Sequence, residues 1–282
     1  MEGVLAASEA GLIRPVLLGK PEIIRNLCRE LGCNADRFTI IEADSESAAA
    51  QTGVEQVLAG KAHALIKGWI HTDALMRPVL AQLRSTRRIS HIFITELPRY
   101  PKLLYITDAA INIAPDLTTK MQIVQNAVDL LHMLGVKCPA VAALSAVELV
   151  KPAIPSTLDA ACLSKMAQRG QISGAILDGP LAFDNAISSE AAKTKHIHSD
   201  VAGNADILLV PDLDAGNILA KDLEYLAGAT IAGIVIGAQV PIMLPSRSDP
   251  PTARLASAAI AVLMHHLWPD YRHADETITA PS

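Results

Sequence analysis

A serine, an arginine and an aspartate lie close together in the segment VPIMLPSRSDPP (240–251), at Ser246, Arg247 and Asp249. An apolar run precedes them, and an alanine-rich helical pattern follows them. The guanidinium group of an arginine offers a planar fork of donors that suits phosphate. The free N–H groups and the dipole at a helix N-terminus also attract anions. These residues therefore predict an anion site, with phosphate as its natural ligand.

Two of these residues also have a simpler interpretation. Asp249 followed by Pro250 is typical of a helix start, with aspartate as the N-cap and proline at the first helical position. Arg247 could instead form a salt bridge on the surface or at an interface. Its place directly after a predicted buried strand favours the anion site.

The composition excludes several classes of protein. The 282 residues are half hydrophobic and only 3% aromatic, and they carry a net charge of −5. A negative chain is a poor non-specific binder of nucleic acid. No apolar run reaches the ~18 residues of a membrane span, and the N-terminal segment does not read as a signal peptide. We therefore expect neither nucleic acid nor membrane as a partner.

Cysteine usage and motifs limit the chemistry further. The four cysteines lack CxxC spacing, which favours reduced thiols and a cytoplasmic protein. The chain has no GxGxxG, no GxxxxGK[ST] and no GxSxG motif. His196, His198 and Asp200 form the only close group with metal-binding residue types, and a polar loop explains them better. We therefore expect no metal ion and no bound cofactor.

Short β-rich runs alternate with helical patterns along the chain, which predicts an α/β fold with mostly parallel sheets. In such folds ligands bind at the carboxyl ends of the strands. Polar residues follow several of the predicted strands in this way. They are Lys67 after ALI, Asp108 after LLYIT, Asp178 after AIL, Asp212 after ILLV, and Ser246 with Arg247 after PIML.

A family resemblance covers roughly residues 3–260. The segments that carry it are AHALIKGWIHTDALMRPVL, SHIFITE, ITDAAINIAPDLTTKMQIVQNAVDLLHMLG, SGAILDGPLAFDNAIS, VAGNADILLVPDLDAGN and VPIMLPSRSD. They resemble the phosphate acetyltransferase/phosphate butyryltransferase family. The details are most similar to the butyryl branch, and related domains occur with enoyl-CoA hydratases.

The resemblance implies two α/β lobes, similar to those of isocitrate and isopropylmalate dehydrogenases, with the active site in the cleft between them. The first lobe would comprise residues 1–109 with 241–282, and the second residues 110–240. The resemblance also implies a homodimer or larger homo-oligomer. Relatives usually begin with a further strand, so we expect either that the native start lies upstream or that this lobe is trimmed.

The implied reaction converts acyl-CoA and phosphate into acyl phosphate and CoA, by direct thiol attack in a ternary complex, with CoA as a substrate and no cofactor. Arg247 matches the family's phosphate-binding arginine. Ser246 matches a serine expected to stabilise the tetrahedral transition state or to orient the leaving phosphate. Asp249 matches the aspartate of the butyryl branch, a candidate base. The acetyl branch has its aspartate where this chain has Ala253.

Other residues fit the family's substrate-binding positions. Arg77 and Lys67 are candidates for binding CoA or phosphate, although Arg77 could equally be a helix-surface arginine. Asp178 and Asn217 also fit the family pattern. Aspartate and asparagine at strand ends are more often turn-forming residues.

Two alternatives stay open at this stage. A catalytically degenerate module that binds CoA or phosphate would fit the uncertain base and the absent first strand. A metal- or NAD-dependent oxidoreductase on the same scaffold is a further alternative. It would need a set of metal-binding aspartates and a nucleotide loop, and neither is evident in the sequence.

Overall fold

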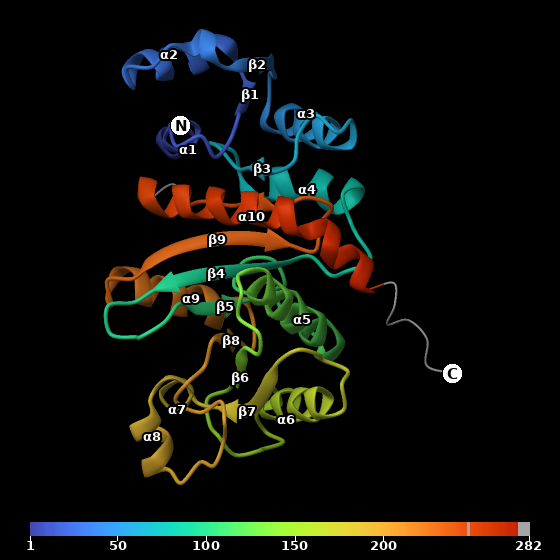
Figure 1. Cartoon of the computed structure of the whole chain (residues 1–282), viewed down its shortest axis with the longest axis vertical. Coiled ribbons are helices and arrows are strands. Elements are labelled where there is room, and N and C mark those ends of the chain that lie inside the picture. The colour runs from blue at the N-terminus through green and yellow to red at the C-terminus, as the bar shows by residue number, and fades with distance from the viewer. Residues whose placement is uncertain (247–248, 276–282) are drawn as a thin grey trace. The chain divides into compact units, whose positions relative to one another are not determined.

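The computed structural model describes residues 1–246 and 249–275, with residues 268–275 as helix backbone alone. The chain forms two compact units (Figure 1): unit 1 comprises residues 1–87 and the chain from Ala232 onward, and unit 2 comprises residues 88–231. The sequence places lobe boundaries at 109/110 and 240/241, and those bounds stay a prediction.

Unit 1 contains two groups of strands. Strand β1 pairs in parallel with β2, and β3 pairs in parallel with β10, which is antiparallel to β9. Strand β9 (Thr230–Ile236) carries the chain from unit 2 back into unit 1. The other elements are α1 (Glu2–Glu9), β1 (Val16–Gly19), α2 (Pro21–Glu30), the 3-10 turn η1 (Ala35–Arg37), β2 (Thr39–Glu42), α3 (Glu46–Leu58), β3 (Leu65–Ile66), α4 (Thr72–Gln82), β10 (Ile242–Met243) and α10 (Pro251–Asp275).

Unit 2 contains strands in the order β4-β5-β8-β6-β7, and every pair is parallel except β4 with β5. Strand β4 pairs with β5, and β5 pairs with β8, so β4 and β5 both belong to this unit. Its elements are β4 (Ser90–Glu96), β5 (Leu104–Thr107), α5 (Leu117–Met133), β6 (Ala140–Leu144), α6 (Pro155–Gln168), β7 (Ile176–Leu181), α7 (Phe183–Ile187), α8 (Ser189–Thr194), β8 (Ile207–Leu209) and α9 (Leu213–Tyr225).

The predicted α/β fold with mostly parallel strands is confirmed, and the apolar runs form the core. Two strand pairings depart from the mostly parallel pattern. Strand β4 is antiparallel to β5, and β9 is antiparallel to β10. An apolar run indicates that both faces of a strand are buried. It does not show whether the strand is parallel or antiparallel to its neighbours. Within the described residues, no helix has the length and apolarity needed to span a membrane.

Helix α5 shows how local sequence sets an element. The Asp116 side chain accepts a hydrogen bond of 2.8 Å from the Thr119 N–H, which caps the helix. Residue Gly135, with φ of +90°, ends it in the left-handed region that glycine tolerates. A capping aspartate and a closing glycine thus set the two ends of α5.

Helix α9 lies unusually close to the strands that precede it. A Cβ atom added at Gly216 would lie 2.7 Å from Cγ2 of Val210 and 2.8 Å from Cβ of Ala109. A larger residue at this position would push the first turn of α9 away from the ends of β5 and β8. The glycine therefore fixes where Asn217, the next residue, can lie.

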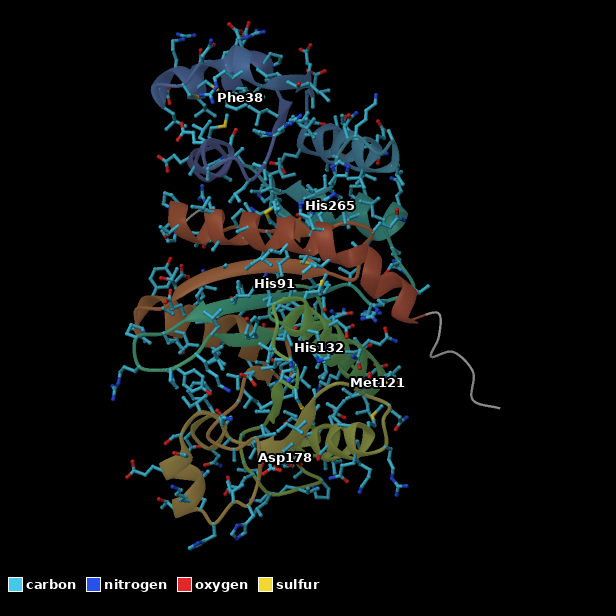
Figure 2. All side chains as sticks on the ribbon, in the orientation of Figure 1. Phe38, His91, Met121, His132, Asp178 and His265 are labelled. Carbon is cyan, nitrogen blue, oxygen red and sulfur yellow. The ribbon has the colours of Figure 1, made fainter. Side chains whose placement is uncertain are left out.

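The buried histidine of β4 predicts acid sensitivity. His91 is 1% exposed, and its Nδ1 has no hydrogen-bond partner in the described part of the chain. Figure 2 labels His91. Burial lowers the pKa of His91 to about 3. An unfolded chain binds this proton near pH ~6.5, so the free energy of unfolding falls as the pH drops from there toward the folded value.

We expect the free energy of unfolding to fall by about 2 kcal/mol more in the wild type than in His91→Leu between pH 7.5 and pH 5. Urea unfolding of both proteins at several pH values measures this difference. Parallel pH profiles for the two proteins would contradict a neutral, buried His91.

Candidate active site

Two neighbouring strands of unit 1 bring candidate residues to one edge. The parallel pairing of β3 with β10 aligns Ile66 with Met243, and the Lys67 N–H donates to the Met243 carbonyl at 2.9 Å. The residues that follow β3 and β10 therefore leave the sheet on the same side. The sequence placed Lys67 and Ser246 each after a strand, and the structure makes those strands neighbours.

The turn after β10 surrounds Ser246 with charged groups. The Ser246 N–H donates to Oδ2 of Asp249 at 2.7 Å, and the Asp249 N–H donates to the Ser246 carbonyl at 3.3 Å. The same carbonyl accepts a hydrogen bond of 3.2 Å from Nη2 of Arg254. The serine is thus held between a carboxylate on one side and a guanidinium on the other.

The N-cap interpretation of Asp249 is wrong by one residue. Helix α10 begins at Pro251, and the N–H groups of Ala253 and Arg254 point to the Pro250 carbonyl at 3.1 and 3.4 Å. Pro250 therefore occupies the N-cap position, and Asp249 precedes it. The aspartate carboxylate folds back onto Ser246. Arg247 lies outside the described residues, and its role as the phosphate-binding group stays a prediction.

The β3–α4 connection supplies the other candidate cations of unit 1. Lys67 is 9% exposed, and its Nζ lies 3.5 Å from the Ile70 carbonyl. Arg77 is exposed on α4, whose opposite face buries Leu75 and Val79. Both substrate-binding assignments stay predictions. A helix-surface position, the simpler interpretation of Arg77, is what the structure shows.

Sequence reasoning missed Arg254. A cation in the first turns of a helix opposes the helix dipole, so it is unfavourable there unless a specific partner holds it. The Ser246 carbonyl, which accepts a hydrogen bond from Arg254, is such a partner. The position of this arginine so near the predicted helix start was the signal that could have revealed it.

A comparison with known protein families shows which family shares these residues. The family described as phosphate acetyl/butaryl transferase matches residues 46–262, which include Lys67, Arg77 and the whole turn after β10.

The chain belongs to this family.

Curated members of the phosphate acetyl/butaryl transferase family align with almost the whole chain. A phosphate acetyltransferase of Rhizobium meliloti is 52% identical over 264 residues, covering 93% of this chain and 84% of that protein. A phosphate butyryltransferase of Clostridium acetobutylicum is 39% identical over 267 residues, covering 94% and 89%. Of these two relatives, the one named for acetyl transfer therefore has the higher identity.

Solved structures support the family and the fold. A branched-chain phosphotransacylase from Enterococcus faecalis V583 is 32% identical, with a TM-score of 0.76, over 89% of this chain and 99% of that one. A 4-hydroxythreonine-4-phosphate dehydrogenase from Klebsiella pneumoniae is 12% identical, with a TM-score of 0.51 over 89% of each chain. The second likeness shows the fold alone, and it confirms the expected similarity to dehydrogenase folds.

The family resemblance implies two places for the catalytic base, and Ala253 occupies one of them. The structure buries Ala253, which is 2% exposed, near the start of α10. This position offers no proton acceptor on its side chain. Asp249 therefore keeps the candidate role of base, which stays a prediction.

The two candidate residues of unit 2 each make a hydrogen bond to the backbone. Oδ1 of Asp178, on β7 and labelled in Figure 2, accepts the N–H of the next residue, Gly179, at 2.8 Å. Nδ2 of Asn217, in the first turns of α9, donates to the Ala109 carbonyl at 3.3 Å. The Asp178 bond fits the turn-forming interpretation, whereas the Asn217 bond ties α9 to the loop after β5. The substrate-binding roles of Asp178 and Asn217 stay predictions.

Asp108 organises the loop after β5. The side chain is 2% exposed, and Oδ1 accepts the N–H groups of Ala110 and Ile111 at 2.9 and 3.1 Å. Oδ2 accepts the N–H and Nδ2 of Asn112 at 3.2 and 2.5 Å. Burial raises the pKa of Asp108, and these hydrogen bonds oppose the rise. The carboxylate thus orders the loop whose Ala109 carbonyl holds Asn217.

A buried ion pair lies at the carboxyl ends of β6 and β8. Nζ of Lys120 is 2.7 Å from Oδ2 of Asp159, and the two residues line a cavity of about 10 Å³ with Ser156. A volume of this size holds about one water molecule. In the described part of the chain, no cluster of His, Cys, Asp or Glu is arranged to hold a metal ion.

Proposed function

We propose that this chain catalyses the reversible transfer of an acyl group between CoA and inorganic phosphate, with Ser246 and Arg247 at the reacting centre. The observation that carries the proposal is the Ser246 turn. It follows a strand beside the Lys67 strand end, and it is held by Asp249 and Arg254. Membership of the phosphate acetyl/butaryl transferase family supports the same reaction.

In the proposed reaction, a phosphate oxygen attacks the thioester carbonyl of acyl-CoA. The C–S bond then breaks, and CoA leaves as a thiolate that takes up a proton. In reverse, the thiol loses its proton and attacks the acyl phosphate carbonyl. Arg247 binds the phosphate oxygens, and the Ser246 hydroxyl donates to the carbonyl oxygen as negative charge develops there. Donors placed for a developing oxyanion contribute about 2.7–4 kcal/mol.

In this proposal Asp249 positions Ser246 and also serves as the base. Its Oδ2 accepts the Ser246 N–H, which fixes the serine backbone relative to α10. A base near the thiol need not be strong, because a thiol with a pKa of about 8.5 is partly ionised at neutral pH. Most of the rate enhancement would then come from holding the two substrates in register, up to about 7–11 kcal/mol.

We also propose the substrates, the oligomeric state and the cellular location of the protein. The substrates are acyl-CoA and phosphate, and no cofactor takes part. A homodimer or larger homo-oligomer in the cytoplasm is the proposed state. Because the Rhizobium meliloti relative named for acetyl transfer is the more similar, we propose acetyl-CoA as the preferred substrate, ahead of butyryl-CoA.

A panel of acetyl-, propionyl- and butyryl-CoA tests this proposal. We expect CoA release that requires phosphate, with the highest kcat/KM for acetyl-CoA, measured with a thiol reagent. Hydroxylamine trapping of the acyl phosphate identifies the second product. Release at equal rates with and without phosphate would mean hydrolysis, and would contradict phosphate as the acyl acceptor.

A further inference from the structure

Helix α2 ends in a motif that joins two cysteines. The Cys33 N–H donates to the Cys28 carbonyl at 2.9 Å, and the Gly32 N–H donates to the Arg29 carbonyl at 3.2 Å. Gly32 has a φ of +67°. This is the double hydrogen bond of a Schellman motif, in which glycine takes the left-handed position after the helix. The motif brings the side chains at its two ends into contact, and here both ends are cysteines.

The two thiols lie together in different surroundings. Cys28 is fully buried, Cys33 is partly exposed, and both are free. Burial raises the pKa of the Cys28 thiol, and the adjacent Cys33 thiol raises it further. This second effect arises because the two thiols lie beside each other. The direct backbone bond keeps the two residues adjacent, which a disulfide requires, because it joins Cα atoms about 4.4–6.8 Å apart.

We propose that Cys28 and Cys33 form a redox-active dithiol pair, which peroxides convert reversibly into an intramolecular disulfide at the end of α2. The partly exposed Cys33 attacks the peroxide O–O bond as its thiolate and becomes a sulfenic acid, while one oxygen leaves and is protonated to water. The Cys28 sulfur then attacks the Cys33 sulfur, and the second oxygen leaves as water. Two thiols and one hydrogen peroxide thus give one disulfide and two waters.

The burial of Cys28 favours a disulfide between Cys28 and Cys33 as the product of oxidation. A buried thiol with a raised pKa reacts slowly with peroxide in solution, because the thiolate is the nucleophile. It is nevertheless held beside the sulfenic acid at Cys33, where the reaction is intramolecular. Cys138 and Cys162 are both exposed. They serve as internal controls for simple accessibility.

The sequence makes the test direct, because trypsin cleaves between the two cysteines at Arg29. The whole protein is treated with hydrogen peroxide, blocked with N-ethylmaleimide, unfolded and digested without reductant. We expect the peptides NLCR (26–29) and ELGCNADR (30–37) to appear as one cross-linked species that dithiothreitol separates. We also expect the oxidised protein to melt a few degrees higher, because the disulfide restricts the unfolded chain.

Cys33→Ser is the matched control, since it leaves the buried Cys28 in place. In this variant Cys28 should stay reduced, and its peptide should react with N-ethylmaleimide once the protein is unfolded. The proposal is overturned if Cys33 proceeds to sulfinic or sulfonic acid while Cys28 stays reduced. It is equally overturned if Cys33 links only to Cys138 or Cys162. The readout is a mass, so it does not depend on the proposed acyl transfer.

Discussion

Replacing Ser246 with alanine is expected to lower kcat for phosphate-dependent CoA release by about 10²–10³-fold. The substitution removes a hydroxyl at the turn after β10 but keeps the backbone N–H that binds Asp249 and the carbonyl that binds Arg254. The turn should therefore keep its shape, and the loss should fall on the transition state. We expect KM for acyl-CoA to change by much less than kcat.

The matched control is Ser173→Ala, which removes an exposed serine hydroxyl from a loop of unit 2. Its kcat should equal that of the wild type. Circular dichroism and thermal melting show whether Ser246→Ala stays folded. An alanine variant with wild-type kcat would exclude the Ser246 hydroxyl from the reacting centre and leave its backbone as the only contribution.

Replacing Asp108 with alanine is expected to lower the free energy of unfolding by about 3–5 kcal/mol. The carboxylate accepts three backbone N–H groups and Nδ2 of Asn112. The three N–H groups would lose this acceptor, whereas Nδ2 of Asn112 would keep its bond to the Ile89 carbonyl. Some of the cost is regained, because burial raises the pKa of Asp108 and so disfavours its charged form. Urea unfolding at pH 7 measures the net effect.

Asp108→Asn is the informative comparison. Its amide oxygen can replace one carboxylate oxygen, but its NH₂ group faces the donors that the other oxygen accepted. We expect a loss smaller than that of alanine by at least 1 kcal/mol, since half of the acceptor capacity remains. Equal stability of the wild type and both variants would mean that water replaces the carboxylate and that Asp108 does not order the loop.

Much of the fold follows from the apolar runs, whereas strand neighbours do not. The sequence places Lys67 and Ser246 at the ends of two strands. Only the fold shows that β3 and β10, far apart along the chain, are paired in parallel. Pairing across such a separation depends on how the whole core packs, and no local pattern of residues records it. The same limit explains why the antiparallel pairings of β4 with β5 and of β9 with β10 were not predicted.

The details of the turn could not be predicted because local signals compete. Two successive prolines, Pro250 and Pro251, both fit the first helical position, and the structure uses the second. Because the helix begins one residue later than expected, Asp249 does not occupy the N-cap position. Its carboxylate instead accepts a hydrogen bond from the Ser246 N–H. Arg254 reaches the Ser246 carbonyl from within the helix, where periodicity alone indicates only which face it occupies.

The arsenate-dependent release of CoA from acetyl-CoA, compared between the wild type and Arg247→Ala, tests acyl transfer most directly. Arsenate replaces phosphate as acceptor, and the acyl arsenate hydrolyses, so the thiol released reports every turnover. We predict steady release by the wild type and by the exposed-arginine control Arg14→Ala, with a loss of about 100-fold or more in Arg247→Ala. Calorimetric titration with CoA shows whether each protein still binds it. A wild type that binds CoA but releases none from acetyl-CoA would contradict catalysis and leave a CoA-binding module.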